Sequence, residues 1–88
     1  AENKTLRGAG RMKLLYFAIV RERLKRSEED IDFTGTVAEL RKVLIEKYPE
    51  LEPILQRVKF AVNEEYVEDE YMLRGEERVA IIPPVSGG

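Results

Sequence analysis

Hydrophobic and polar positions alternate with two different periods along the chain, and the changes of period mark its elements. Residues 13–20 form a β-branched and aromatic run typical of a central strand buried on both faces. Residues 29–33 alternate between polar and apolar side chains, as a half-buried strand does. Residues 21–26 are polar apart from Leu24, and we expect a loop or short helical turn there. The two runs are close enough to pair as an antiparallel hairpin.

The next segment has the helical period. Thr36 and Glu39 have the spacing of a capping box, in which the Thr36 hydroxyl accepts from the Glu39 amide and the Glu39 side chain reaches back. Pro49 disfavours helical geometry at Tyr48 and should end the helix there. Six apolar residues fall along one side of this helix: Val37, Leu40, Val43, Leu44, Ile45 and Tyr48. A helix with one apolar face needs a sheet to lie on.

Strand signals return after a connecting stretch at residues 50–56. Residues 58–62 alternate as a strand, and residues 63–65 predict a turn into a short edge strand at 66–67. We expect Met72 and Leu73 to pack beneath the sheet. Residues 74–77 predict a turn with Gly75 at positive φ. Residues 78–82 predict the last strand, with Val79 and Ile81 on one face and the alternate residues on the other.

This order of elements predicts an α+β fold of two layers. One main helix packed across a mixed sheet of four to five strands, with the first and last strands as central neighbours, satisfies it. That arrangement is the β-grasp, or ubiquitin-like, fold. Residues 12–88 are expected to form this single domain, whose core is thin at such a length. Residues 1–11 show no period, and we expect a cloning remnant or a disordered leader.

Composition narrows the classes of function. The chain is 43% apolar and 36% charged, which indicates a globular domain, and its net charge of −2 argues against a nucleic-acid partner. It contains no cysteine or histidine, so it lacks disulfides, thiolate metal sites and the usual general base. The longest apolar run, residues 14–20, is far too short to span a membrane, and we expect a cytoplasmic protein.

The candidate chemistry lies at the end of the chain, where two prolines and two glycines follow the last strand. Glycines lack Cβ atoms and can pass through a narrow channel, and residues 85–88 span at most about 13 Å. Pro83 and Pro84 fix φ and favour a stiff exit from the sheet. The terminal carboxylate of Gly88 is ionised at neutral pH and is a poor electrophile, so it needs an activating partner. A frayed end, with prolines that only block strand pairing, is the alternative.

Other candidate groups are better explained by structure. The acidic clusters at residues 28–30, 64–65 and 68–70 lack the spacing of a calcium loop, and we expect a solvated face and no metal site. Tyr16 and Phe17 are expected in core or interface packing. Arg21 is a candidate partner contact near the base of the tail, although a plain surface arginine is an equal alternative.

Residues 81–88, behind the turn at 73–76 and with Tyr16-Phe17-Ala18 in the first strand, resemble the small subunit of molybdopterin synthase, a MoaD-type sulfur carrier. The resemblance covers residues 12–88, and the ending Pro-Pro-Val-Ser-Gly-Gly is its most specific element. Ser86 stands where alanine is common in the family. The leader of eleven residues also departs from the family pattern.

The resemblance implies a complete cycle of sulfur transfer. An E1-like enzyme with ATP would adenylate Gly88, and a sulfur donor would convert the adenylate to a thiocarboxylate. The tail would then enter the large synthase subunit, where sulfur passes to cyclic pyranopterin monophosphate, and two carriers would flank a dimer of large subunits in a heterotetramer. The chain itself would bind no cofactor and would not be a catalyst alone. The residues inserted into the channel would be Pro83, Pro84, Val85, Ser86 and Gly87, with Ile82 and Arg21 at the partner interface.

Two other classes of function remain open. The chain is also compatible with a sulfur carrier for thiamine, cysteine or tRNA thiolation, or with a protein modifier attached to lysines through Gly88. A β-grasp interaction module with an inert end is the third possibility. An enzyme with its own active site is disfavoured, because no acid–base residues form a recognisable motif.

Overall fold

The computed structural model of the chain describes residues 11–84, and every structural statement below concerns this part. The leader up to residue 10 and the predicted tail positions Val85, Ser86, Gly87 and Gly88 lie outside the described residues. The elements in chain order are β1 (Met12–Tyr16), α2 (Ala18–Leu24), β2 (Glu28–Ile31), β3 (Gly35–Thr36), α3 (Val37–Lys47), the 3-10 helix η1 (Pro49–Leu51), α4 (Glu52–Leu55), β4 (Lys59–Val62), β5 (Glu65–Val67), β6 (Met72–Leu73) and β7 (Arg78–Ile82).

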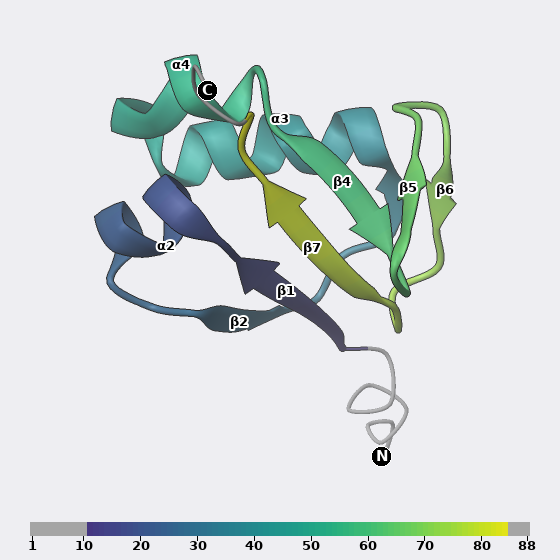
Figure 1. The fold of residues 1–88 in the computed structure, drawn as a ribbon. Helices are drawn as coiled ribbons and strands as arrows, with labels where there is room; N and C mark the ends of the chain where they lie inside the picture. Colours follow the sequence, from purple (N-terminus) through teal and green to yellow (C-terminus); the bar gives the residue numbers. More distant parts are fainter. Residues whose placement is uncertain (1–10, 85–88) are drawn as a thin grey trace.

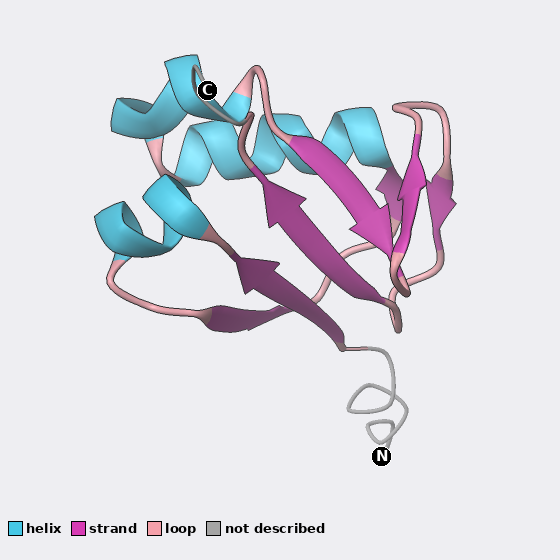
Figure 2. Cartoon of the chain, viewed as in Figure 1, coloured by secondary structure: helices cyan, strands magenta, loops and turns pink. Residues whose placement is uncertain are grey.

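Five of the strands form one mixed sheet in the order β2-β1-β7-β4-β5. β1 and β7 lie side by side and parallel, with Leu14 opposite Val79, while β1 and β2 form the expected antiparallel hairpin. α3 lies across one face of the sheet (Figure 1). Figure 2 shows the second layer, in which helices cover that face and the short β3–β6 pair stands at the side. The predicted β-grasp arrangement, with the first and last strands as central neighbours, is confirmed.

The core lies between the sheet and α3. Alternate side chains of β1 and β7 point into it, and the apolar face of α3 packs against them. Each such side chain stabilises the fold by about 1.5–3 kcal/mol relative to an exposed position. The fully buried members from these three elements are Met12, Leu14, Tyr16, Val37, Leu40, Leu44, Val79 and Ile81.

Both predicted ends of α3 are confirmed. The Glu39 amide donates to the Thr36 hydroxyl at 3.2 Å, and the Thr36 amide donates to the Glu39 carboxylate at 2.9 Å, which completes the capping box. Lys47 is the last helical residue, and Tyr48 follows as the C-cap directly before Pro49. The helix therefore begins and ends where local chemistry requires it.

The predicted strand over residues 13–20 is wrong in its second half. β1 ends at Tyr16, Phe17 keeps an extended backbone as the N-cap, and α2 begins at Ala18, whose φ of 53° lies in the left-handed region. Val20 still reaches the core, but from a helix. A continuous apolar run has no period that separates a buried strand from a buried helix. The expected loop or helical turn at residues 21–26 belongs to α2 as far as Leu24.

Two smaller expectations also need correction. The connecting stretch at residues 50–56 is mostly helical, since it contains most of η1 and all of α4. Met72 does not pack beneath the sheet: its side chain is 60% exposed, whereas Leu73 is buried as expected. Both belong to β6, and neighbouring side chains of a strand point to opposite faces.

The two-residue turn between β4 and β5 holds Asn63 and Glu64 at φ of 49° and 75°. Two positive φ values are those of a type I′ hairpin turn, in which glycine is the preferred second residue. We expect Glu64→Gly to raise the free energy of unfolding by about 0.5–1 kcal/mol in urea titrations. Glu65→Gly, inside β5, should lower it by a similar amount. A loss of stability in Glu64→Gly would contradict this assignment of the turn.

Candidate functional site

The tail begins at the end of β7, a strand bordered on both sides by β1 and β4. Ile82 is half-buried at its last position, Pro83 is buried and Pro84 is exposed. Figure 1 shows this end of β7 directed toward α2 and α4. Because a central strand is hydrogen-bonded on both edges, the tail leaves the domain from one of its most strongly held elements.

A small hollow of about 180 Å³ adjoins this point, and we name it the tail-root hollow. Pro83 and Pro84 form one wall of it. The other walls come from α2 and from the α4 region. The residues that these elements contribute are Ile19, Pro53, Ile54 and Arg57. Except for Arg57, its lining is apolar.

A second apolar surface lies on the face of the sheet opposite α3, where side chains of β1, β4 and β7 point outward. A hollow of about 330 Å³ there is lined in part by Leu15, Phe17, Ala61 and Ala80. Phe17 is 42% exposed, whereas Tyr16 is fully buried. The two aromatic residues therefore have different environments: Tyr16 belongs to the core, and Phe17 is available for an interface.

The sequence-predicted site residues fall on elements that flank the tail root. Ile82 ends β7, and Arg21 is exposed on α2. Pro83 and Pro84 mark the start of the tail, as expected. The roles of Arg21 and Ile82 in partner binding stay predictions.

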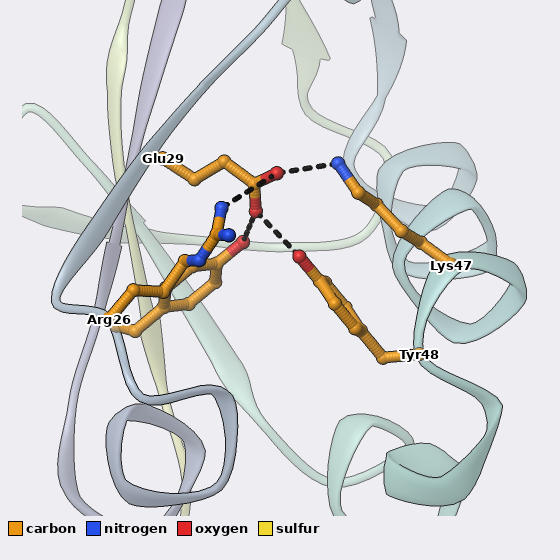
Figure 3. A network of polar contacts seen from close by, with 5 residues as sticks. Arg26, Glu29, Lys47 and Tyr48 are labelled. Carbon is orange, nitrogen blue, oxygen red and sulfur yellow. Dashed lines mark hydrogen bonds and ion pairs between the residues drawn. The ribbon is translucent and has the colours of Figure 1, made fainter.

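Sequence reasoning missed a polar network around the Glu29 carboxylate, shown in Figure 3. One carboxylate oxygen accepts hydrogen bonds from the hydroxyls of Tyr16 at 2.6 Å and Tyr48 at 2.9 Å. The other pairs with Lys47 at 2.5 Å and with Arg26 at 3.3 Å. The Glu29 side chain is only 10% exposed. The network joins β1 and β2 to the end of α3.

The titration behaviour of the network indicates a structural role. Burial alone would raise the pKa of Glu29, but hydrogen bonds from Lys47, Tyr16 and Tyr48 outweigh it and hold this pKa below its usual value. Burial and the hydrogen bond to Glu29 raise the pKa of Tyr16 and of Tyr48. The hydrogen bond to Glu29 raises the pKa of Lys47. The pKa values of Glu29, Tyr16, Tyr48 and Lys47 all shift away from pH 7, so none of these four groups is suited to exchange protons at that pH.

This network predicts a specific acid sensitivity. Since the pKa of Glu29 is lower in the folded chain, its charge stabilises the fold above the unfolded-state pKa, and that stabilisation is lost as pH falls through the folded-state value. We expect Glu29→Gln to lower the free energy of unfolding at pH 7 by about 1–2 kcal/mol and to flatten its decline between about pH 5 and pH 3. Urea titrations across this range, with Asp30→Gln as the exposed control, measure it. An unchanged acid slope in Glu29→Gln would contradict the assignment.

Arg41 is a second polar residue that holds the fold. One of its terminal nitrogens (Nη1) donates to the carbonyls of Leu55 at 2.8 Å and Val58 at 3.0 Å, and the other (Nη2) pairs with Asp69 at 2.8 Å. Its guanidinium also lies 5.0 Å from the centre of the Phe60 ring. A hollow of about 520 Å³ beside it is therefore lined by an arginine already engaged in the fold. Its partners lie 14 to 28 residues away, beyond the reach of any local pattern.

Glu77 fixes the predicted turn before β7. Its carboxylate accepts from the amides of Arg74, Gly75 and Glu76 at 2.8 to 3.1 Å. Burial raises the pKa of Glu77, but these amide donors outweigh burial and lower it overall. Gly75 has φ of 108°, in agreement with the predicted glycine position.

Neither of two other kinds of site is found among residues 11–84. No three side chains of the cysteine, histidine, aspartate or glutamate type are grouped so as to hold a metal ion there. In the same part of the chain, no helix has the length and apolarity needed to cross a membrane.

Comparison with known proteins decides the family. The sequence profile of the ThiS family matches residues 14–88. A molybdopterin synthase sulfur carrier subunit from Caenorhabditis briggsae is 35% identical over 88% of this chain and 96% of its own length. The chain belongs to the ThiS family, and within it to the molybdopterin synthase sulfur carriers. This confirms the family resemblance inferred from the C-terminal sequence.

Solved structures agree on the fold of this sulfur-carrier family. Small archaeal modifier protein 1 from Methanosarcina acetivorans has a TM-score of 0.75 at 23% identity, over 90% of this chain and 97% of that one. A chain from a complex of subunits 1 and 2 of the molybdopterin-converting factor of Helicobacter pylori has a TM-score of 0.63 at 20% identity, over 89% of this chain and 99% of that one. At these identities the likeness shows the β-grasp fold alone.

Proposed function

We propose that this chain is the sulfur carrier subunit of a molybdopterin synthase and that the carboxyl group of Gly88 carries the sulfur. The observation that supports this most is the family match, which runs to Gly88 and includes the Gly87-Gly88 pair. The curated relative matched over 96% of its length has the same named role.

The proposed chemistry has two activation steps outside the chain. The Gly88 carboxylate attacks ATP in an E1-like enzyme, and an acyl adenylate and pyrophosphate form. A sulfide-level sulfur from a donor then displaces AMP and leaves a thiocarboxylate. ATP is consumed by the partner, and the carrier holds no cofactor of its own. Its lack of cysteine and histidine makes this dependence on partners necessary.

Delivery follows from the position of the tail root. In the large subunit, the thiocarboxylate sulfur bonds to a carbon of cyclic pyranopterin monophosphate, the C–O bond at that carbon breaks, and its oxygen leaves. Water then cleaves the acyl C–S bond of the resulting thioester, which leaves the sulfur on the pterin and regenerates the Gly88 carboxylate. Pro83 is buried and β7 is held on both edges, so the tail starts from a rigid base. A rigid base lowers the ordering entropy lost when the tail enters a channel.

The proposed partner is the large synthase subunit, in a heterotetramer with two carriers. The Helicobacter pylori structure, whose title names a complex of subunits 1 and 2, supports a partner of this kind. On this chain the exposed ring of Phe17, with Ile82 and Arg21 near the tail root, provides a surface for it. We place this assembly in the cytoplasm.

Reconstitution tests the proposal. The chain, a large subunit, an E1-like enzyme, ATP and sulfide should convert cyclic pyranopterin monophosphate to molybdopterin, measured as its fluorescent oxidation product. No product with a large subunit that is active with its own carrier would contradict the proposed function.

A protein modifier is the second candidate, because the chain has the Gly87-Gly88 pair through which an isopeptide bond would form, on a fold that small archaeal modifier protein 1 shares. It would form isopeptide bonds between Gly88 and lysines. Mass spectrometry of cell extracts for lysines that carry a Gly-Gly remnant distinguishes the two functions. Abundant adducts together with failed reconstitution would favour the modifier.

A further inference from the structure

The tail-root hollow has the size and lining of a receptor for one apolar side chain. Its volume of about 180 Å³ is bounded by the two prolines, by Ile19 of α2 and by Ile54 of α4. Arg57, the second residue after α4, adds an exposed cation to the rim. Such a hollow fits an apolar side chain of a partner protein. The cation at its rim fits a carboxylate on the residue before or after that side chain in the partner.

The length of the tail brings any receiving protein to this hollow. Residues 85–88 span at most about 13 Å when fully extended. A protein that holds Gly88 in its active site must therefore approach Pro84 to within that distance. Pro84 is itself a wall of the hollow, so the receiving surface reaches the hollow and α2 together.

Charged side chains are distributed unequally between the α2 region and the β5–β6 region of the domain. Residues 21–26, in α2 and directly after it, carry four cations and one carboxylate, a net charge of +3: Arg21, Glu22, Arg23, Lys25 and Arg26. The neighbouring strand β2 carries three carboxylates, of which Glu28 and Asp30 pair with Lys13 and Glu29 pairs with Lys47 and Arg26. Residues 63–77, which contain β5 and β6, carry seven carboxylates and one arginine, a net charge of −6. Figure 1 shows α2 and the β5–β6 region on opposite sides of the domain. Residues 21–26 therefore form a local positive patch on the side of the domain away from β5 and β6.

We propose that the tail-root hollow, with Arg57 in its lining and Arg21 on the adjoining helix α2, is a docking surface for the large subunit that receives the tail. An apolar side chain of that subunit fills the hollow, and its carboxylates pair with Arg57 and Arg21. This inference rests on the proposed function and adds the chemistry of the partner surface. The positive patch on α2 favours an approach in which this side of the carrier meets the carboxylates of the large subunit first.

Binding of the large subunit to the intact carrier tests this, with calorimetry at low and high salt. Arg57→Glu should raise the Kd at low salt about tenfold, and the effect should shrink as salt screens the charges. Pro53→Asp should weaken binding about tenfold at both salt concentrations, because it places a charge in the hollow. Asp is well tolerated in the first turn of a helix, so α4 should persist. Arg74→Glu, with the same charge change on the acidic side, should bind like the unaltered chain.

The outcomes separate this inference from the proposed function. If the unaltered carrier binds and both Arg57→Glu and Pro53→Asp bind within twofold of it, the docking surface is wrong while the proposed function stands. If Arg74→Glu weakens binding as much as Arg57→Glu, net charge explains the effect, and the docking surface is again wrong. If the unaltered carrier fails to bind a large subunit that is active with its own carrier, both proposals fail. Thermal melts of each variant confirm that the fold is retained.

Discussion

Deletion of Gly87 and Gly88 should reduce molybdopterin formation to the background without carrier, while the domain stays as stable as the full chain. The deletion removes the carboxyl group that is proposed to be activated, and the new terminus at Ser86 is two residues shorter. A displacement of the reacting group by about 1 Å can slow a reaction about a hundredfold, and two residues correspond to about 7 Å. The deletion removes no residue of the described core, whose last member is Ile81 of β7. Reconstituted product formation and thermal melting measure the two parts of this prediction.

Two further variants control for chain length and for the terminal side chain. Deletion of Ala1 and Glu2 shortens the chain equally at the other end and should leave the rate unchanged. Gly88→Ala should keep the fold but slow loading or transfer, because a methyl group then stands beside the reacting carbonyl. Product formation at the normal rate after loss of Gly87 and Gly88 would contradict the proposed role of the tail.

Leu40→Asp should unfold the domain. Leu40 is fully buried in the middle of α3, within the core between this helix and the sheet. Loss of the leucine side chain lowers the free energy of unfolding by about 2–5 kcal/mol, and a buried carboxylate without a partner lowers it further. Together these approach or exceed the roughly 5–15 kcal/mol that holds a typical domain folded. Circular dichroism at 25 °C should show loss of helix and no cooperative thermal transition.

Lys42→Asp is the matched control on the same helix. Its side chain is exposed, so the new carboxylate stays in water. The change should lower the free energy of unfolding by only about 0.5–1 kcal/mol, because aspartate has a lower helix propensity than lysine. A folded Leu40→Asp variant with a normal melting curve would show that α3 does not pack as described.

The elements that the sequence predicted correctly are those with a clear period or a local signal. α3 has both a capping box and a stopping proline, and β7 alternates between a buried and a half-buried face. The central, neighbouring positions of β1 and β7 followed from the order of elements, because few two-layer arrangements accommodate a hairpin, a helix and a long last strand.

α2 was missed because its apolar residues continue those of β1 without a change in pattern. Only the left-handed φ of Ala18 separates strand from helix, and alanine carries no sequence signal for that conformation. Arg57 was missed for a related reason, since nothing local shows that the end of α4 lies beside Pro83 and Pro84.

The Glu29 network had a signal that was visible in the sequence. In the predicted alternation of residues 29–33, Glu29 falls on the same face as Ile31 and Phe33, so a carboxylate stands at an inward position. An inward charge requires partners. Lys47 and Tyr48, 18 and 19 residues later, could be recognised as those partners only from the structure.

The most direct test of the sulfur-carrier assignment is the intact mass of the chain after incubation with an E1-like enzyme, ATP and sulfide. The account predicts a mass increase equal to the exchange of one oxygen for sulfur, dependent on ATP and located in the C-terminal peptide that ends at Gly88. An unchanged mass with an enzyme that loads its own carrier under the same conditions would contradict it.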